Sequence, residues 1–262
     1  MNKKQVFAVI VLFLVTLLFS LAINLPVRHL LRFVEIKAPL QLHGLSGTIL
    51  QGKIEQLGYE QFVVSEVSFS FQPVCLLRAV VCYQFSSDDR ELLLNVEGNP
   101  LTRKISARQS RITLESELLQ DLPQLLVKPK GEFAVVIEDL SVVDGLLSDL
   151  EASIDWLGAG VQGEDQLLGN YRALIIKQPE QLSITLSDTD SLLKVAGDIN
   201  LEWNGRYAMD LQFVSQPSLN PSVTSVLSMA TTRSGLNSFS LKKSGKMDAS
   251  SQLFLRRMYE VY

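Results

Sequence analysis

The longest hydrophobic stretch of the chain lies at its N-terminus, in residues 6–23. Only Thr16 and Ser20 interrupt it, and neither is charged. As a helix this stretch would measure about 27 Å, close to the roughly 30 Å of a bilayer's hydrocarbon core. A helix that is apolar on all faces at this length predicts a transmembrane anchor rather than a buried core helix. We therefore assign residues 1–25 to a membrane anchor.

The sequence leaves open whether this anchor is removed. Ser20-Leu21-Ala22 is a small-x-small triplet that fits a cleavage site, but the apolar stretch exceeds the 7–15 residues of a signal core and favours an uncleaved anchor. The bases on its two sides do not decide the orientation; they are Lys3 and Lys4 before it and Arg28, Arg32 and Lys37 after it. The short leading segment and the exported character of the remainder predict a cytoplasmic N-terminus.

Beyond Pro39 the polarity alternates with a period of two, which predicts β-strands with one solvated face. The alternation is clearest in four segments: residues 65–71, 150–156, 182–186 and 198–213. In the last of these, Asn204-Gly205 separates two alternating runs. This arrangement predicts a β-hairpin closed by a type I′ turn, which needs positive φ at both central residues.

Helical spacing is rare in the rest of the chain. Residues 26–34 fit a short helix after the anchor, and residues 117–127 fit another that Pro123 interrupts. Asn220-Pro221 reads as an N-cap and first helical position before apolar residues at helical spacing. Residues 235–247 return to a strand pattern, and the tail from 253 to 262 is undecided.

The fold class expected from these patterns is mainly β. An N-terminal transmembrane helix precedes an elongated, mostly antiparallel β-sheet domain, residues 26–262, with a few short helices. A weak internal repeat in the sequence is compatible with two similar β-units, residues 38–130 and 131–246. It is equally compatible with an ordinary β-meander, because successive hairpins resemble one another.

The distribution of charged residues limits the kinds of partner that the protein can bind. The chain has 262 residues, 47% of them hydrophobic, and a net charge of −4. Residues 132–202 carry fourteen acids against three bases. Nucleic-acid binding needs a cationic footprint, so this acidic middle argues against a nucleic-acid partner. Bases predominate after Arg233, and we interpret them as a solvated end rather than a lipid-binding patch.

The two cysteines, Cys75 and Cys82, are separated by six residues. Outside the cytoplasm a disulfide closing this small loop is the favoured interpretation, with two buried free thiols as the alternative. A metal site would need further ligands, and the only histidines, His29 and His43, are distant in sequence. We therefore predict no metal site.

No combination of residues predicts catalysis. Two histidines leave no evident metal cluster or nucleophile–base pair. Glycine-rich segments 44–47 and 158–163 lack the Lys-Ser/Thr of a phosphate loop, so turns are favoured there. The adjacent acids at 138–139 and 164–165 are interpreted as solvated positions. We expect a protein that is not an enzyme and has no catalytic residue, metal or cofactor.

Residues 42–59 contain Gly44, Gly47, Thr48 and Gly52, which fit a G-x-x-G-T-hydrophobic-W-x-G pattern with Leu50 at the tryptophan position. Here the chain resembles a known family, protein N of the bacterial type II (general) secretion pathway, and the resemblance spans most of the chain. The next family segment, V-x-W-x-L-x-P-x-x-L-L, is matched at Val67, Pro73, Leu76 and Leu77, with Phe69 and Phe71 replacing Trp and Leu. Later glycine-punctuated strands of the family are matched around Gly197 and Gly205.

This resemblance implies a bitopic, single-pass protein of the bacterial inner membrane, with its N-terminus in the cytoplasm and most of its mass in the periplasm. It implies a non-catalytic accessory or assembly component whose partners are other type II secretion components. Residues 6–23 would contact membrane lipid. The family offers no catalytic residue to transfer, and its motif residues are structural.

A weaker likeness runs to the AsmA-type and LptC-type periplasmic proteins, which form a lipid-carrying β groove. This alternative predicts an open trough for lipid or another hydrophobic ligand, lined by residues such as Phe69, Ile154, Trp156 and Trp203. A packed interior would favour the assembly role instead. Alternation alone does not separate the two, because a dry core and an open apolar groove use the same residue types.

Overall fold

The structure is a computed structural model. It describes residues 10–14, 16, 17, 20, 24, 26, 27, 40–59, 62–87, 91–116 and 128–247. The chain divides into two compact units, Met1–Leu93 and Leu94–Tyr262. The proposed sub-units 38–130 and 131–246 remain a prediction beside this division.

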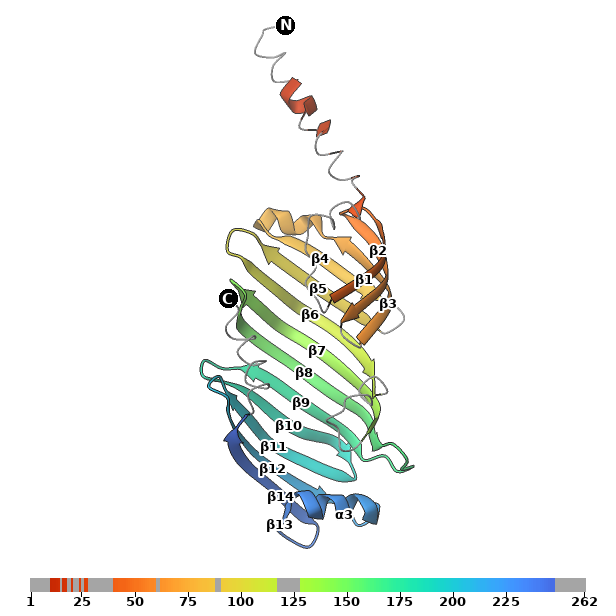
Figure 1. The fold of residues 1–262 in the computed structure, drawn as a ribbon, viewed down its shortest axis with the longest axis vertical. Helices are drawn as coiled ribbons and strands as arrows, with labels where there is room; N and C mark the ends of the chain where they lie inside the picture. The colour runs from red at the N-terminus through yellow and green to blue at the C-terminus, as the bar shows by residue number, and fades with distance from the viewer. Residues whose placement is uncertain are drawn as a thin grey trace. The chain divides into compact units, whose positions relative to one another are not determined.

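The fold is mainly β, as predicted, with few short helices (Figure 1). Fourteen strands form one sheet whose neighbours follow chain order, except that β14 lies between β12 and β13. The elements are β1 (Leu40–Gly47), β2 (Gln51–Tyr59), β3 (Phe62–Phe71), η1 (Pro73–Arg78), β4 (Val81–Ser87), β5 (Leu92–Asn99), β6 (Lys104–Glu115), β7 (Pro129–Val143), β8 (Leu146–Val161), β9 (Gly169–Lys177), β10 (Gln181–Ser191), β11 (Leu193–Glu202), β12 (Arg206–Ser215), α3 (Pro221–Ala230), β13 (Thr232–Arg233) and β14 (Ser238–Lys246).

Most of the predicted anchor, residues 6–23, lies outside the described residues. Those that are described, 10–14, 16, 17 and 20, are helical, and Thr16 Oγ1 donates to the carbonyl oxygen of Leu12 at 2.7 Å. Among the described residues, no helix has both the length and the apolar character needed to cross a membrane. The helix predicted at 117–127 and the tail at 253–262 also lie outside the described residues, as does nearly all of the helix predicted at 26–34.

In the first unit, β1 to β4 form consecutive antiparallel pairs. The alternation predicted for residues 65–71 is confirmed in β3, where Val67 is fully buried and Phe69 is 7% exposed. Phe69 contacts two aromatic side chains of β4, Tyr83 and Phe85, with ring centroids 6.5 and 6.3 Å apart. These rings and Ile54 of β2 form the apolar side of this unit.

The second unit contains the longest strands, β7 and β8, which are 15 and 16 residues long. The predicted strands at 150–156 and 182–186 lie within β8 and β10. The strand predicted at 235–247 is confirmed as β14, and the predicted helix is confirmed as α3. Asn220 caps α3 as predicted, because its side chain accepts a hydrogen bond from the backbone N–H of Ser222 at 3.0 Å.

The predicted hairpin is confirmed by the pairing of β11 with β12, but its predicted turn type is wrong. Leu201 pairs with Tyr207, and three residues, Trp203-Asn204-Gly205, form the loop. Gly205 has φ +84°, whereas Asn204 has no positive φ. The N–H of Gly205 donates to the carbonyl of Glu202 at 2.9 Å. A turn followed by one left-handed glycine matches a three-residue hairpin loop rather than a type I′ turn.

Candidate functional site: the glycine turn and the apolar sheet face

Three of the motif residues, Gly47, Thr48 and Gly52, lie in and beside the turn between β1 and β2, and Gly44 lies three residues before Gly47 within β1. Gly47 and Gly52 are direct cross-strand partners, so they close the turn from both sides. The N–H of Thr48 donates to the carbonyl of Gln51 at 2.8 Å. These residues therefore form the tight end of one β-hairpin.

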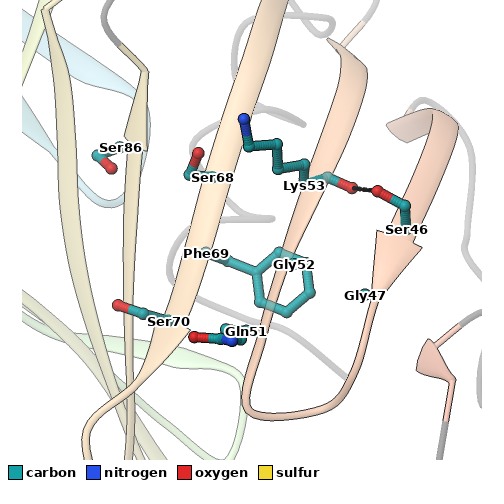
Figure 2. Close-up of a pocket in the computed structure, with 9 residues that line it drawn as sticks. All are labelled: Ser46, Gly47, Gln51, Gly52, Lys53, Ser68, Phe69, Ser70 and Ser86. Atoms are coloured by element: carbon teal, nitrogen blue, oxygen red, sulfur yellow. Dashed lines mark hydrogen bonds between the residues drawn. The ribbon is translucent and has the colours of Figure 1, made fainter.

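Glycine is needed at both closing positions because other atoms occupy the space of a side chain. Gly47 has φ +99°, and a Cβ added there would lie 2.5 Å from the carbonyl oxygen of Gln51. At Gly52 a Cβ would overlap the carbonyl oxygen of Ser46 and lie 2.5 Å from Cζ of Phe69. Figure 2 shows the Phe69 ring lying against Gly52. An aromatic ring covering a strand glycine in this way stabilises the pairing.

Gly44 lies inside β1, although a turn was the expectation for residues 44–47. The pairing passes from His43–Gln56 to Leu45–Ile54, so Gly44 and Glu55 are left between two registered pairs. Gly44 has φ +66°, and the Glu55 side chain occupies the place of its missing Cβ. Only the last residue of the segment, Gly47, leads into the turn. The second glycine-rich segment likewise begins within β8 and reaches a turn only after Val161.

A shallow hollow of about 460 Å³ lies over this part of the first unit (Figure 2). Small polar side chains dominate its lining, which also includes the Phe69 ring and the Lys53 side chain. The Ser46 hydroxyl donates to the carbonyl of Lys53 at 3.4 Å. The lining residues are Ser46, Gly47, Gln51, Gly52, Lys53, Ser68, Phe69, Ser70 and Ser86. This lining offers hydrogen-bond donors and acceptors and contains no histidine, cysteine or carboxylate.

The end of this hairpin is tied to β3, to β4 and to the chain that follows the predicted anchor. The N–H of Phe71 donates to the carbonyl of Leu50 at 2.7 Å, and the Tyr83 hydroxyl donates to the carbonyl of Ile49 at 3.1 Å. Burial raises the pKa of the Tyr83 hydroxyl, so it stays a neutral donor. Pro26 forms an isolated antiparallel bridge with Thr48.

Cys75 and Cys82 are joined by a disulfide in the structure, with their Cα atoms 5.9 Å apart. The bond connects η1 to β4, and the N–H of Gln72 donates to the carbonyl of Cys82 at 2.9 Å. Both cysteines are at most 9% exposed. Pro73 occupies the first position of η1, where its missing N–H costs no helical hydrogen bond. With both sulfurs bonded, neither thiol is available as a metal ligand.

The remaining motif glycines lie in the second unit. Gly197 is in β11, where a Cβ would lie 2.8 Å from Cα of Leu211 and overlap the carbonyl oxygen of Asp210. Gly205 forms the hairpin loop described above. Thus Gly197 and Gly205 shape a hairpin of their own and lie in a different unit from the β1–β2 turn.

One face of the second unit's sheet is apolar across eight strands. Direct cross-strand partners share a face, and one continuous row of partners contains no polar side chain. The row, from β6 to β14, is Ile112, Val135, Ile154, Ala173, Leu186, Gly197, Leu211 and Leu241. The opposite face carries polar pairs such as Arg172–Asp155 and Thr185–Asp198. This single-sided pattern is the alternation that the sequence predicted.

Most of this row is half-buried, and Leu211 is 6% exposed. Among the described residues of this unit, the main contacts between elements run between sheet neighbours and between α3 and β14. Two side chains of α3, Val223 and Leu227, pack on a buried cluster of Leu168, Leu193 and Leu219. The helix therefore covers one end of the apolar face (Figure 1).

The tryptophans lie at separate places in this unit. Trp156 stacks on Phe133 at a centroid distance of 5.3 Å and contacts Tyr171 at 5.8 Å. Its Nε1 donates to the carbonyl of Lys130 at 3.0 Å. Trp203 lies in the β11–β12 loop, with Nζ of Lys177 5.6 Å from its ring centroid. Ile154 and Trp156 thus belong to the apolar face, whereas Trp203 lies at its hairpin end.

Sequence reasoning missed two connections that hold α3. Glu164, interpreted as solvated, accepts hydrogen bonds from Asn220 Nδ2 at 2.6 Å and Ser222 Oγ at 2.9 Å. The Gln166 side chain accepts one from the N–H of Asn220 and donates one to the carbonyl of Ser218. These contacts join residues more than fifty positions apart, and no local pattern in the sequence signals them.

Tyr171 is the most strongly perturbed group among those described. Burial, and secondarily the charge of Asp188, raise the pKa of its hydroxyl well above the ordinary 10.0. The hydroxyl donates to the carbonyl of Leu193 at 2.8 Å. Its neutral form is therefore a fixed structural donor. His43 is exposed on β1, and His29 lies outside the described residues.

The comparison with protein families found a match. The family model for protein N of the type II secretion system matches residues 38–242, which include the β1–β2 turn, Gly197, Gly205 and every strand in full except β14. No curated protein and no solved structure matches the chain significantly.

Proposed function

The chain belongs to the type II secretion system protein N family, and from this premise we propose that it is a non-catalytic accessory or assembly component of that machinery. Residues 6–23 would anchor it in the inner membrane, with the N-terminus in the cytoplasm. The β domain, residues 26–262, would stand in the periplasm and contact other secretion components. The match implies involvement in type II secretion, and the specific role is our proposal.

The observation that supports this role is the position of the motif glycines at the end of a hairpin. Gly47 and Gly52 build a rigid hairpin end, and the hollow beside them offers hydrogen bonds but no reactive pair. Beside them, β1 is the terminal strand of the sheet order. A terminal strand presents backbone N–H and C=O groups that a strand of a partner can pair with. We therefore place the contact with a secretion partner on β1 and the β1–β2 turn.

Isolation of the full-length protein from cells tests the proposal. The protein would be extracted with a mild detergent from cells that express a type II secretion system, and co-isolated proteins would be identified by mass spectrometry. We expect components of the secretion system to be recovered and to disappear in a strain that lacks the system. Recovery of only lipid-handling or unrelated envelope proteins would contradict the assembly role.

A second candidate function rests on the apolar face of the second unit. Its row of eight apolar partners lacks a second β-layer among the described residues, which suits a carrier of lipid or another hydrophobic ligand in an open groove. Two neighbouring residues of β10 offer a matched test. Leu186 is on the apolar face, and Ser187 is exposed on the other face.

Under the carrier hypothesis, Leu186→Asp would lower the amount of lipid that co-purifies with the protein, and Ser187→Asp would not. Mass spectrometry of organic extracts would measure the lipid per protein. If the parent protein carries no more lipid than a membrane protein of similar anchor length, the carrier hypothesis fails and the assembly role stands alone.

A further inference from the structure

The short helix η1 displays three apolar side chains to solvent. Val74 is 73% exposed, Leu76 is 53% exposed and Leu77 is 89% exposed. Exposed apolar side chains are common singly, but three within four residues form a surface that requires an explanation.

The fold holds this surface in place. Cys75, between Val74 and Leu76, is buried and bonded to Cys82. Ala79 ends η1 in the left-handed conformation at φ 55°, and its N–H donates to the carbonyl of Leu76 at 3.0 Å. Because the cysteine points inward and is fixed, its apolar neighbours are directed outward. The order of η1 does not depend on the exposed side chains.

The connections of the first unit link η1 to Pro26, which directly follows the predicted anchor, residues 1–25. Two residues separate Pro26 from Ile23, the last residue of the apolar stretch, so the chain keeps Pro26 within about 11 Å of it. Pro26 bridges Thr48, and the following Ile49 accepts the hydrogen bond of Tyr83 from β4. The β3–β4 connection that holds η1 begins directly after Phe71, which donates to Leu50.

The charge of this connection suits a phospholipid surface. From residue 67 to residue 87 the only charged side chain is that of Arg78, in the last turn of η1. Exposed alkyl side chains in a segment that contains no acid fit the interface of a bilayer, where they enter the acyl region. A surface that binds another secretion protein usually contains both polar and apolar side chains.

We infer that η1 inserts Val74, Leu76 and Leu77 into the periplasmic leaflet of the membrane that residues 6–23 span. This inference rests on the proposed function for the anchor and its orientation. The insertion gives the protein a second membrane contact beside the anchor. The glycine turn is thereby held at the membrane surface, within reach of the membrane-embedded part of a secretion machine.

Tryptophan quenching in the full-length protein tests the insertion. Leu77→Trp would be reconstituted into vesicles of phosphatidylcholine and phosphatidylglycerol with or without bromine on the acyl chains. Leu236→Trp is the control, because Leu236 is 87% exposed in the β13–β14 loop of the second unit. After subtraction of the parent's emission, we expect roughly twofold or greater quenching at position 77 and little at position 236. Equal quenching at both positions would overturn the inference.

Flotation of the same vesicles separates this inference from the proposed anchor. If the protein floats with the vesicles and position 77 is not quenched, the anchor stands and the insertion is wrong. If the parent protein fails to float, the anchor is wrong, and so is the insertion that rests on it. A photoreactive residue at position 77 that captures a secretion protein instead of lipid in cells would show that η1 is a protein interface, which would also overturn the inference.

Discussion

The two units of the molecule reach the same kind of sheet by different means. The first unit depends on a few backbone positions, because Gly47 and Gly52 close its hairpin and one disulfide holds η1. The second unit depends on side-chain rows that repeat along long strands. A unit held by a few backbone positions loses much of its stability when one of them is substituted. A row of apolar side chains of similar size tolerates many substitutions.

The two units also differ in their content of charged residues. Residues 67–87 of the first unit carry one charged side chain, and residues 132–202 of the second carry fourteen acids against three bases. In the second unit these acids alternate with the apolar row and keep one face solvated. We therefore expect the first unit to supply specific contacts and the second to supply long strands with one apolar and one solvated face.

The largest effect is predicted for Gly52→Val. The added side chain would overlap the carbonyl of Ser46 and the Phe69 ring, so the turn and the aromatic contact cannot both persist. We expect a loss of about 3 kcal/mol in the free energy of unfolding, measured by denaturant titration of the full chain in detergent.

Gly58→Ala is the matched control for this prediction, because Gly58 lies in the same strand, β2, and is buried there. Its added Cβ would be in ordinary contact with Gln41 at 3.4 Å. We expect a change within about 0.5 kcal/mol. Comparable losses for the two variants would mean that the motif glycine has no special role.

Loss of the disulfide ranks next. Replacing both cysteines, Cys75→Ser together with Cys82→Ser, releases a small loop, and the chain-entropy relation gives about 2.5 kcal/mol for a loop of this size. Reducing agent should lower the midpoint of unfolding of the parent protein and leave the double variant unchanged. Free thiols titrated in the denatured, unreduced parent would refute the bond.

A smaller effect is predicted for Trp156→Ala in the second unit. The substitution removes the stacking on Phe133 and the contact with Tyr171, but other apolar partners in the row remain. We expect a loss of about 2 kcal/mol, again from denaturant titration. The neighbouring Leu157→Ala is the control, because Leu157 is 43% exposed and should change stability by less than about 1 kcal/mol. A Trp156 effect larger than that of Gly52→Val would reverse the contrast between the units.

The smallest effect is a dependence on alkaline pH that originates at Tyr171. Its pKa is raised in the folded protein, so above the ordinary value of 10.0 the unfolded chain loses this proton first. The contribution of Tyr171 to the free energy of unfolding is therefore fully present below about pH 10. It decreases as the pH rises further, by about 1 kcal/mol at about pH 11. The difference in unfolding free energy between the parent and Tyr171→Phe, followed from neutral to alkaline pH, should shrink over this range. A constant difference would contradict it.

Local patterns predicted much of the fold. Alternation located β3, β8 and β10, and Asn220-Pro221 located the start of α3, because periodicity and capping are properties of neighbouring residues. Asn204-Gly205 located a hairpin but not its turn. The three-residue loop depends on the register of β11 with β12, which the dipeptide alone does not determine.

The candidate site was predicted less completely. The sequence identified Gly47 and Gly52 as motif residues but did not show that they pair with each other or that Phe69 covers Gly52. The exposure of Leu76 and Leu77 also could not be read from the sequence, since it depends on which way the disulfide loop turns. Glu164 was assigned to solvent because its partners on α3 are more than fifty residues away.

Site-resolved photocrosslinking in living cells tests the central claim most directly, namely that the first unit contacts the secretion machinery. A photoreactive residue would replace Gln41 or His43 on β1, and for comparison Thr189 or Asp190 on β10; all four are exposed. We predict that the β1 positions capture an identified type II secretion component, that the β10 positions capture much less, and that the adducts vanish in a strain lacking the system. Equal capture from both strands, or capture from β1 that persists without the system, would contradict the account.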